Sequence, residues 1–245
     1  MKQGTKFLKT FILIVLGSAI FFGLHSCKKN DTYALDFLYG YAPTDTGHYV
    51  IYDVDSISYS NNGIQINDTA HYQLKEIITD TFYDGANEPA FELELYRSND
   101  SGATWIFDRK WWMKKSTTTY QKIEDDVKFI KLVFPPETNK EWNGNLYVSK
   151  DEPFEDFLDW TYRYETVNVP YTINGLNFDS TASVLAVDDA NAITKRLRRE
   201  VYALGVGMVY QEWEILHAPT GVVFPDWNTG NIVGFRIRMR AIAHN

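Results

Sequence analysis

From His48 onward, apolar and polar side chains alternate with a period of two, which is the pattern of β-strands that have one buried face. The apolar members of four such segments are Phe91, Leu93 and Leu95; Trp105, Phe107, Trp111 and Met113; Ile130, Leu132 and Phe134; and Phe235, Ile237 and Met239. We expect each set to share one face of its strand. Extended along the chain, the pattern predicts ten to twelve strands.

Short connections separate these predicted strands. Asn62-Gly63, Asn143-Gly144 and Asn174-Gly175 are residue pairs that tolerate the positive φ of tight hairpin turns. Such turns join antiparallel neighbours, so the pattern favours a meander over a βαβ fold. The sequence therefore predicts an all-β fold, a strongly curved antiparallel meander that forms a half-barrel or a barrel.

One segment departs from the strand pattern. Ser149 and Glu152 have the spacing of a helix capping box, and Phe154, Phe157 and Leu158 then recur at helical intervals. Pro153 is tolerated only near the start of a helix. We expect one short helix here, packed across a barrel end or a sheet face.

The first 26 residues have the pattern of an export signal. Three lysines precede an apolar run from Phe11 to Leu24, which is shorter than the roughly 20 residues that span a bilayer. The run ends in Leu24-His25-Ser26-Cys27, which resembles the lipobox of bacterial lipoproteins. This resemblance implies that Cys27, the single cysteine of the chain, carries acyl chains such as palmitate and anchors the protein in a membrane.

Three regions follow from this interpretation. We expect a signal peptide over residues 1–26, a lipidated N-terminus and tether over 27–46, and a single antiparallel β domain over 47–245. The expected location is the cell envelope, lipid-anchored in the outer membrane, and the sequence does not decide between its periplasmic and its outer face.

Hydrophobic residues at 44% and aromatic residues at 16% are ample for a packed core. A net charge of −8, with no basic run among aromatics, argues against a nucleic-acid partner.

Residues 98–105 match the Asp-box pattern S-x-D-x-G-x-T-W and resemble the boxes of bacterial sialidases and other β-propellers. In those proteins the box is structural and recurs once per blade, whereas here it occurs once. We expect a hairpin in which Asp100 accepts backbone N–H groups, Gly102 allows the turn and Trp105 packs beneath it.

A second resemblance lies near the C-terminus. The segment from Glu200 to Val209 resembles the E-x-[WY]-[YF]-A-x-G-V-G-x-V turn and strand of uncharacterised bacterial envelope lipoproteins, and Trp142-Asn143-Gly144-Asn145 is similar to a turn that recurs in them. The resemblance implies a curved antiparallel sheet similar to LolA-type half-barrels and lipocalin-like barrels, and it transfers no binding residue. Without a third glycine and a following helix, Gly205 and Gly207 indicate a tight turn before the strand from Met208 to Leu216, and no nucleotide site.

Two carboxylate pairs are the best candidates for catalysis. Glu92 and Glu94, and likewise Glu212 and Glu214, lie two residues apart on predicted strands, a spacing compatible with glycoside hydrolysis. The favoured interpretation is a solvated strand face whose carboxylates pair across strands. For Glu212 and Glu214 the expected partners are Arg236, Arg238 and Arg240.

The sequence contains no motif that indicates a metal site or nucleophilic catalysis. The four histidines after the signal, His48, His71, His217 and His244, are widely separated, and the acidic residues between Asp151 and Asp159 lack the glycine of a calcium loop. We therefore predict no catalytic residue, no metal and no cofactor.

The sequence favours a membrane-anchored, non-enzymatic module that binds an apolar or lipid-like ligand. The alternative is a structural or interaction lipoprotein that contacts envelope proteins and holds no small ligand, and a glycan-directed enzyme ranks third. Aromatic side chains that point inward give the same alternation whether they fill a barrel or line a cavity, so the pattern does not distinguish these two functions. An apolar cavity of a few hundred Å³ would favour the ligand.

Overall fold

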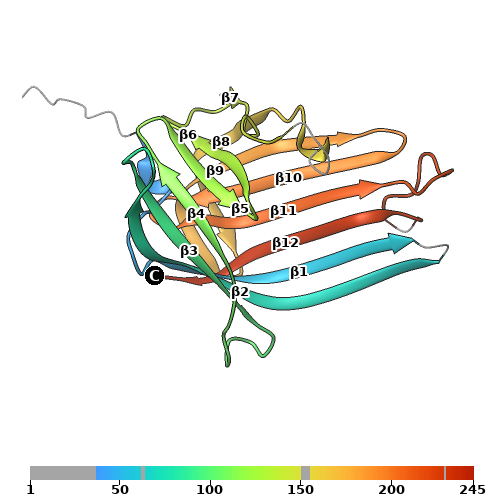
Figure 1. The fold of residues 1–245 in the computed structure, drawn as a ribbon, viewed down its shortest axis with the longest axis horizontal. Coiled ribbons are helices and arrows are strands. Elements are labelled where there is room, and N and C mark those ends of the chain that lie inside the picture. Colours follow the sequence, from blue (N-terminus) through green and yellow to red (C-terminus); the bar gives the residue numbers. More distant parts are fainter. Residues whose placement is uncertain (1–36, 62–63, 150–154, 229) are drawn as a thin grey trace, which may run out of the picture. The chain divides into compact units, whose positions relative to one another are not determined.

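The computed structural model describes residues 37–61, 64–149, 155–228 and 230–245 (Figure 1). The predicted signal peptide, Cys27, the Asn62-Gly63 turn and residues 150–154 of the predicted helix lie outside this part of the chain. The described residues form one antiparallel sheet of twelve strands. The prediction of an all-β, strongly curved meander is confirmed.

The strands follow one another along the chain with two short 3-10 turns. Their bounds are η1 Tyr39–Tyr41, β1 Tyr49–Asn61, β2 Gln65–Tyr83, β3 Pro89–Ser98, β4 Ile106–Lys115, β5 Thr119–Glu124, β6 Val127–Val133, β7 Glu141–Trp142, η2 Glu155–Phe157, β8 Tyr162–Ile173, β9 Leu176–Ala190, β10 Thr194–Ala203, β11 Gly207–His217 and β12 Val233–His244. At the predicted short helix, the described part of the chain forms only the turn η2.

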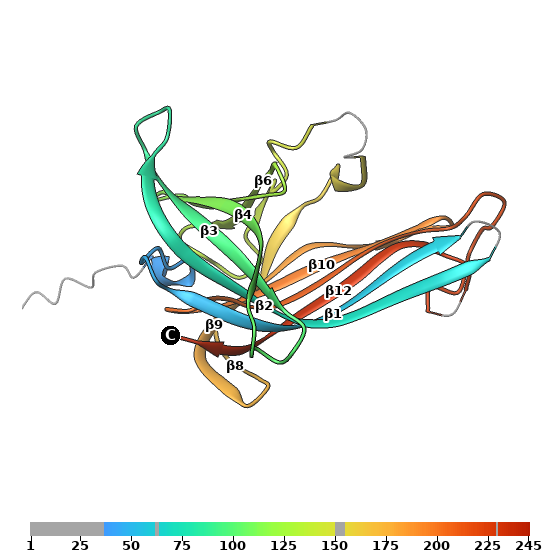
Figure 2. The same ribbon diagram turned by 60° about the horizontal axis from the view of Figure 1, so that its bottom comes forward.

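The spatial order of the strands is β6-β5-β4-β3-β2-β1-β12-β11-β10-β9-β8-β7. Every strand except β1, β6, β7 and β12 therefore pairs only with its two neighbours in sequence, while β1 and β12 pair with each other in the middle of the sheet. The two edge strands, β6 and β7, are consecutive along the chain. The sheet curls so that these edges approach each other (Figures 1 and 2).

The two edges are joined by individual hydrogen bonds. The backbone N–H of Ile130 donates to the carbonyl of Gly144 at 2.7 Å, and the indole N–H of Trp142 donates to the carbonyl of Ile130 at 2.8 Å. The hydroxyl of Tyr164 donates to the carbonyl of Val133 at 2.8 Å and accepts from its N–H at 3.1 Å. Side chains of β7 and β8 thus satisfy the polar backbone of edge strand β6 and nearly close the barrel.

The predicted glycine turns have different outcomes. Asn174 and Gly175 both have positive φ, 48° and 81°, and connect β8 to β9 as a tight hairpin, as predicted. The prediction of a hairpin at Asn143-Gly144 is wrong, because this pair follows β7 and packs against β6. A Cβ at Gly144 would lie 2.3 Å from the ring of Tyr162. Glycine is required there for close packing.

The predicted face of β4 is only partly correct. Trp111 and Met113 face the interior with Leu93 of β3, but a bulge shifts the pairing from Leu95↔Arg109 to Tyr96↔Phe107. The extra residue reverses the alternation, so Phe107 packs edge-on against Tyr96 and is 50% exposed. Sequence alternation alone does not show this reversal.

The Asp-box segment forms the predicted hairpin between β3 and β4. Asp100 accepts the backbone N–H of Thr104 at 2.9 Å, and the hydroxyl of Ser98 accepts the N–H of Gly102, whose φ is +87°. Hydrogen bonds from Ser98 and Thr104 lower the pKa of Asp100 to about 2. The box therefore stabilises a turn.

The domain begins earlier than the predicted boundary at residue 47. Tyr41, in η1, and Ala42 are buried in the main core. Because η1 inserts a tyrosine into the barrel, the end of the predicted tether belongs to the fold.

The strands β1, β2, β9, β10, β11 and β12 continue past the barrel as a long arm (Figures 1 and 2). Tyr59, Leu216 and Ile232 form a second, small core there. The hairpins and loop at the end of the arm expose the apolar side chains Ile64, Ile66, Ile193, Val223 and Phe224.

Candidate ligand cavity and charged belt

Six charged side chains meet inside the barrel, and we call them the charged belt. They are Glu76 of β2, Lys122 and Glu124 of β5, Lys131 of β6, and Arg198 and Glu200 of β10. Lys122 and Glu124, like Arg198 and Glu200, lie two residues apart, so their strands direct both members inward. The belt therefore joins the N-terminal and C-terminal halves of the sheet.

Within the belt, cations and carboxylates contact one another as ion pairs. Lys122 lies 2.6 Å from Glu76. Lys131 lies 3.1 Å from Glu124 and 2.8 Å from Glu200, and Arg198 lies 2.8 Å from Glu124 and 3.0 Å from Glu200. Three cations thus balance three carboxylates in a buried setting, where an unpaired charge would be strongly destabilising.

The belt carboxylates keep their charge despite burial. Burial alone would raise the pKa of Glu124, but Lys131 and Arg198 more than reverse this and hold the pKa well below its usual range. The pKa of Glu200 is also lowered, because Lys131 and Arg198 together outweigh burial. Burial, followed by the neighbouring Glu200, raises the pKa of Tyr202, whose hydroxyl donates to that carboxylate at 2.6 Å. Both carboxylates are therefore ionised at neutral pH, while burial, followed by the neighbouring Arg198, lowers the pKa of Lys131.

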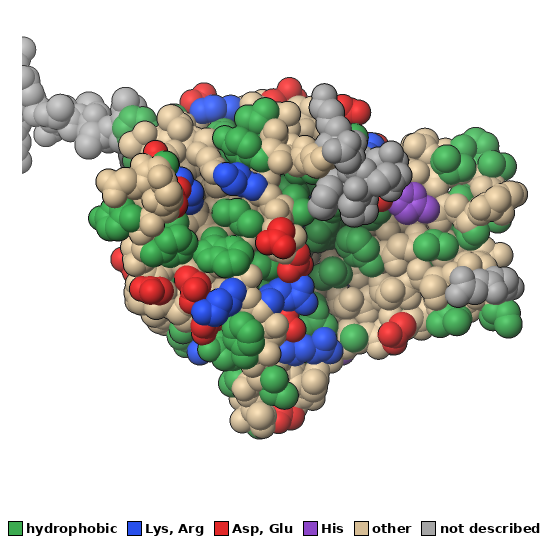
Figure 3. Space-filling view, in the orientation of Figure 1, with side chains coloured by type: hydrophobic (Ala, Val, Ile, Leu, Met, Phe, Trp, Pro, Cys, Tyr) green, Lys and Arg blue, Asp and Glu red, His purple; other side chains and the backbone are tan. Residues whose placement is uncertain are grey.

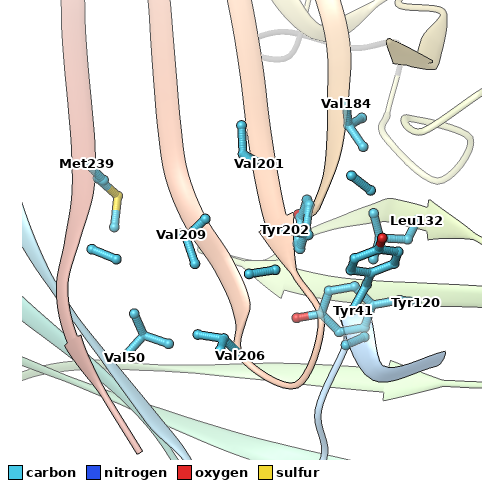
Figure 4. Close-up of a cluster of buried hydrophobic side chains, with 14 of the residues drawn as sticks. Tyr41, Val50, Tyr120, Leu132, Val184, Val201, Tyr202, Val206, Val209 and Met239 are labelled. Carbon is cyan, nitrogen blue, oxygen red and sulfur yellow. The ribbon is translucent and has the colours of Figure 1, made fainter. Parts of the chain in front are cut away.

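On one side of the belt, the barrel is filled by its own side chains. Tyr41, Tyr120 and Tyr202 lie together there with Leu132 (Figure 4). The hydroxyl of Tyr52 donates to the carbonyl of Met208 at 2.9 Å. The space that remains is about 30 Å³, the share of a single water molecule. We call this region the filled end.

On the other side, the barrel holds a cavity of about 240 Å³, which we call the open cavity. Its apolar lining consists of Trp111, Val127, Phe129, Phe157, Met208, Trp213 and Met239. On the corresponding face, Figure 3 shows a hollow with hydrophobic side chains between the barrel and the long strands. Lys122, Glu124, Asp125 and Gln211 also line the cavity, and the first two of them belong to the belt.

Aromatic rings of the open cavity rest against the belt cations. The guanidinium of Arg198 lies 4.1 Å from the ring centroid of Trp213 and 4.9 Å from that of Phe129. The ammonium of Lys122 lies 4.8 Å from the ring centroid of Trp111. Cation–π contacts of this kind fix the rings in place. The belt thus positions the cavity wall as well as its polar end.

The carboxylate pairs predicted from sequence lie away from this cavity. Glu92 and Glu94 lie 2.7 Å and 3.1 Å from Lys110. Glu212 pairs across strands with Arg238 at 2.5 Å, and Glu214 pairs with Arg236 at 3.3 Å. The prediction of cross-strand ion pairs with arginines is confirmed for Glu212 and Glu214.

Arg240 has a different partner from the one expected, because it pairs with Asp55 of β1 at 2.7 Å. The histidines remain apart: His71 contacts Asp53 and Asp55, His217 lies 3.0 Å from Asp156, and His48 contacts the carbonyl of Val206. Among the described residues, no group of three metal-ligating side chains occurs.

The segments that carry the lipoprotein resemblance shape the interior. Glu200 and Tyr202 lie at the belt, and Gly205 and Gly207, with φ of 79° and 89°, form the predicted turn before β11. The amide of Asn145 donates to the carbonyl of Phe157, which positions this cavity residue.

Sequence reasoning missed the belt because alternating charges on a strand are typical of a solvated face. The buried partners lie up to 74 residues apart in the chain.

No family model, curated protein or solved structure matches the chain. Within the described residues, none of the helical segments has the length and apolar character needed to cross a membrane. The function is therefore inferred from the cavity, the belt and the N-terminal sequence.

Proposed function

We propose that this protein is a lipid-anchored envelope protein that binds a small apolar ligand in the open cavity and performs no chemistry on it. The observation that carries the proposal is the cavity itself, about 240 Å³ with seven apolar side chains in its wall. Its volume equals that of about eight water molecules. Water in such a space finds few hydrogen-bond partners, so its replacement by an apolar ligand is favourable.

The belt supports binding over structural filling of the barrel. Its ion pairs hold Trp111, Phe129 and Trp213 around the cavity before any ligand arrives. A preformed wall spares the ligand the cost of ordering those side chains. The same ion pairs separate the cavity from the filled end, so the ligand occupies one side of the belt only.

The membrane anchor rests on the sequence of the export signal and on Cys27. Several acyl chains on one cysteine suffice for stable attachment, because each buried CH₂ contributes about 0.8 kcal/mol. After Cys27→Ala, the protein should leave the membrane fraction. A variant that stays in that fraction would show that the anchor is elsewhere.

Native mass spectrometry of the lipidated protein extracted from membranes tests the ligand. We expect a small apolar molecule that is released on collisional activation. Val127→Phe serves as the matched control, because Val127 lines the cavity and a larger side chain there should exclude the molecule.

A clean apo mass, with no apolar probe bound on titration, would contradict ligand binding. That outcome favours the alternative, an interaction lipoprotein, for which the apolar side chains at the end of the arm are the relevant feature.

A further inference from the structure

Two polar side chains of the open cavity lie outside the belt: Asp125, which pairs with Arg109 at 3.0 Å, and Gln211. Gln211 lies on β11, where it pairs across strands with Glu200 on one side and Met239 on the other. The residue is 6% exposed and lines the cavity. Its side-chain amide makes no hydrogen bond within the described part of the chain. The amide atoms are not fully enclosed, so within the cavity they can pair only with water or with a ligand group, whereas the indole N–H of Trp213 in the same wall is enclosed and has no partner among the described residues.

The charge of the belt restricts which group that is. The three cations and three carboxylates of the belt, of which Lys122 and Glu124 line the cavity, already pair with one another, and the remaining charge in the wall, Asp125, pairs with Arg109. A carboxylate ligand would add a fourth negative charge beside Glu124, and an ammonium ligand would add a fourth positive charge beside Lys122. Either ion would lose its hydration without gaining a free counterion. An uncharged group loses far less.

We infer that the cavity selects an uncharged ligand with one hydrogen-bonding group, such as a hydroxyl, ester or amide, which pairs with the side-chain amide of Gln211. The rest of the ligand is apolar and lies among Trp111, Trp213 and Met239. This inference rests on the proposed function and specifies the ligand class for the same site. An amide suits this task because it offers both a donor and an acceptor.

Four six-carbon probes test the inference: hexan-1-ol, hexane, hexanoate and hexylammonium. Each is titrated into the mature chain from residue 27 carrying Cys27→Ala, so that no acyl chain of the protein competes. Binding is followed by calorimetry and by the intrinsic tryptophan fluorescence, to which Trp111 and Trp213 of the cavity wall contribute. The test variant is Gln211→Met, which keeps the side-chain length and removes the amide. The matched control is Gln121→Met, at a position of β5 that does not line this cavity.

In the unchanged chain, we expect hexan-1-ol to bind at least about tenfold tighter than hexanoate or hexylammonium. Gln211→Met should weaken hexan-1-ol binding roughly five- to tenfold, while hexane binding stays the same or tightens. Gln121→Met should change neither.

Two results would overturn the inference while leaving the proposed function intact. One is equal weakening of hexan-1-ol and hexane by Gln211→Met, and the other is hexanoate or hexylammonium binding as tight as hexan-1-ol. If none of the four probes binds the unchanged chain, the proposed function itself fails, and the inference fails with it.

Discussion

The two ends of the barrel interior share one charged belt and differ in what covers them. At the filled end, η1 places the buried Tyr41 among side chains from the strands, and about 30 Å³ remains. At the open cavity, the belt faces aromatic rings and Phe157 of η2, and about 240 Å³ remains. Met113 and Trp111, two residues apart on β4, line opposite ends. The comparison shows that a short segment outside the sheet, η1, decides which half of the barrel is a core.

The largest expected effect comes from breaking the belt that both ends share. Arg198→Met leaves Glu124 and Glu200 buried with one cation fewer, so we expect a loss of about 3 to 5 kcal/mol in unfolding free energy. Urea denaturation measures the loss. Arg238→Met is the control, because its ion pair with Glu212 is half exposed and should cost less than about 1 kcal/mol. Equal losses for the two variants would show that the belt has no special role.

Two methionines allow the same substitution at both ends. Met113→Ala at the filled end creates a void in a packed core and should cost about 2 to 5 kcal/mol. Met239→Ala only enlarges the open cavity, so its cost should be at least about 1 kcal/mol smaller. Urea midpoints of the two variants, measured together, test the difference. A larger cost for Met239→Ala would mean that the open cavity is packed as tightly as the filled end.

Two valines allow the opposite experiment. Val206→Phe adds a ring where about 30 Å³ is free, and we expect overpacking to cost about 1 to 3 kcal/mol. Val127→Phe adds the same ring beside the open cavity and should leave stability within about 1 kcal/mol. Thermal unfolding compares the two variants, and probe titration should show that only Val127→Phe loses binding. A destabilised Val127→Phe variant would argue against a preformed cavity.

The smallest expected effect is a loss of stability in mild acid. The pKa values of Glu124 and Glu200 are lowered in the fold, so below their unfolded values the unfolded chain binds more protons and stability falls with pH. Between pH 7 and pH 4 we expect a loss of roughly 0.5 to 1 kcal/mol for each carboxylate. Urea midpoints against pH measure it. In Arg198→Met the decline should be shallower, and an unchanged slope would show that these carboxylates do not contribute.

Much of the sheet is predictable from local pattern. Leu93 and Leu95 are buried as their alternation indicates, and Asn174-Gly175 turns as its chemistry requires. The cross-strand partners of Glu212 and Glu214 follow from the register of adjacent strands. The prediction for Phe107 is wrong because a bulge reverses which face of β4 its side chain joins, and a bulge has no clear local signature in the sequence.

The candidate site was much less accessible to sequence reasoning. Lys122 and Glu124 alternate with apolar residues as any solvated strand does, yet they are buried because β5 curls against β10. Nothing in the sequence distinguishes Gln211 from the other glutamines. Its position in the cavity wall follows from strand pairing, which places Glu200 and Met239 on either side of it. From the sequence, we predict that a cavity would distinguish the candidate functions. The volume of that cavity depends on the fold and could not be predicted.

By itself, the sequence determined the strand periodicity and the Asn174-Gly175 turn, and it predicts an export signal that ends at Cys27, because these depend on residues close together in the chain. Only the tertiary structure decided that six charges pair inside the barrel, that Tyr41 fills one end and that the other end stays open. The reason is that alternation tells which residues share a face, whereas burial depends on how far the sheet curls and on which distant strand lies opposite.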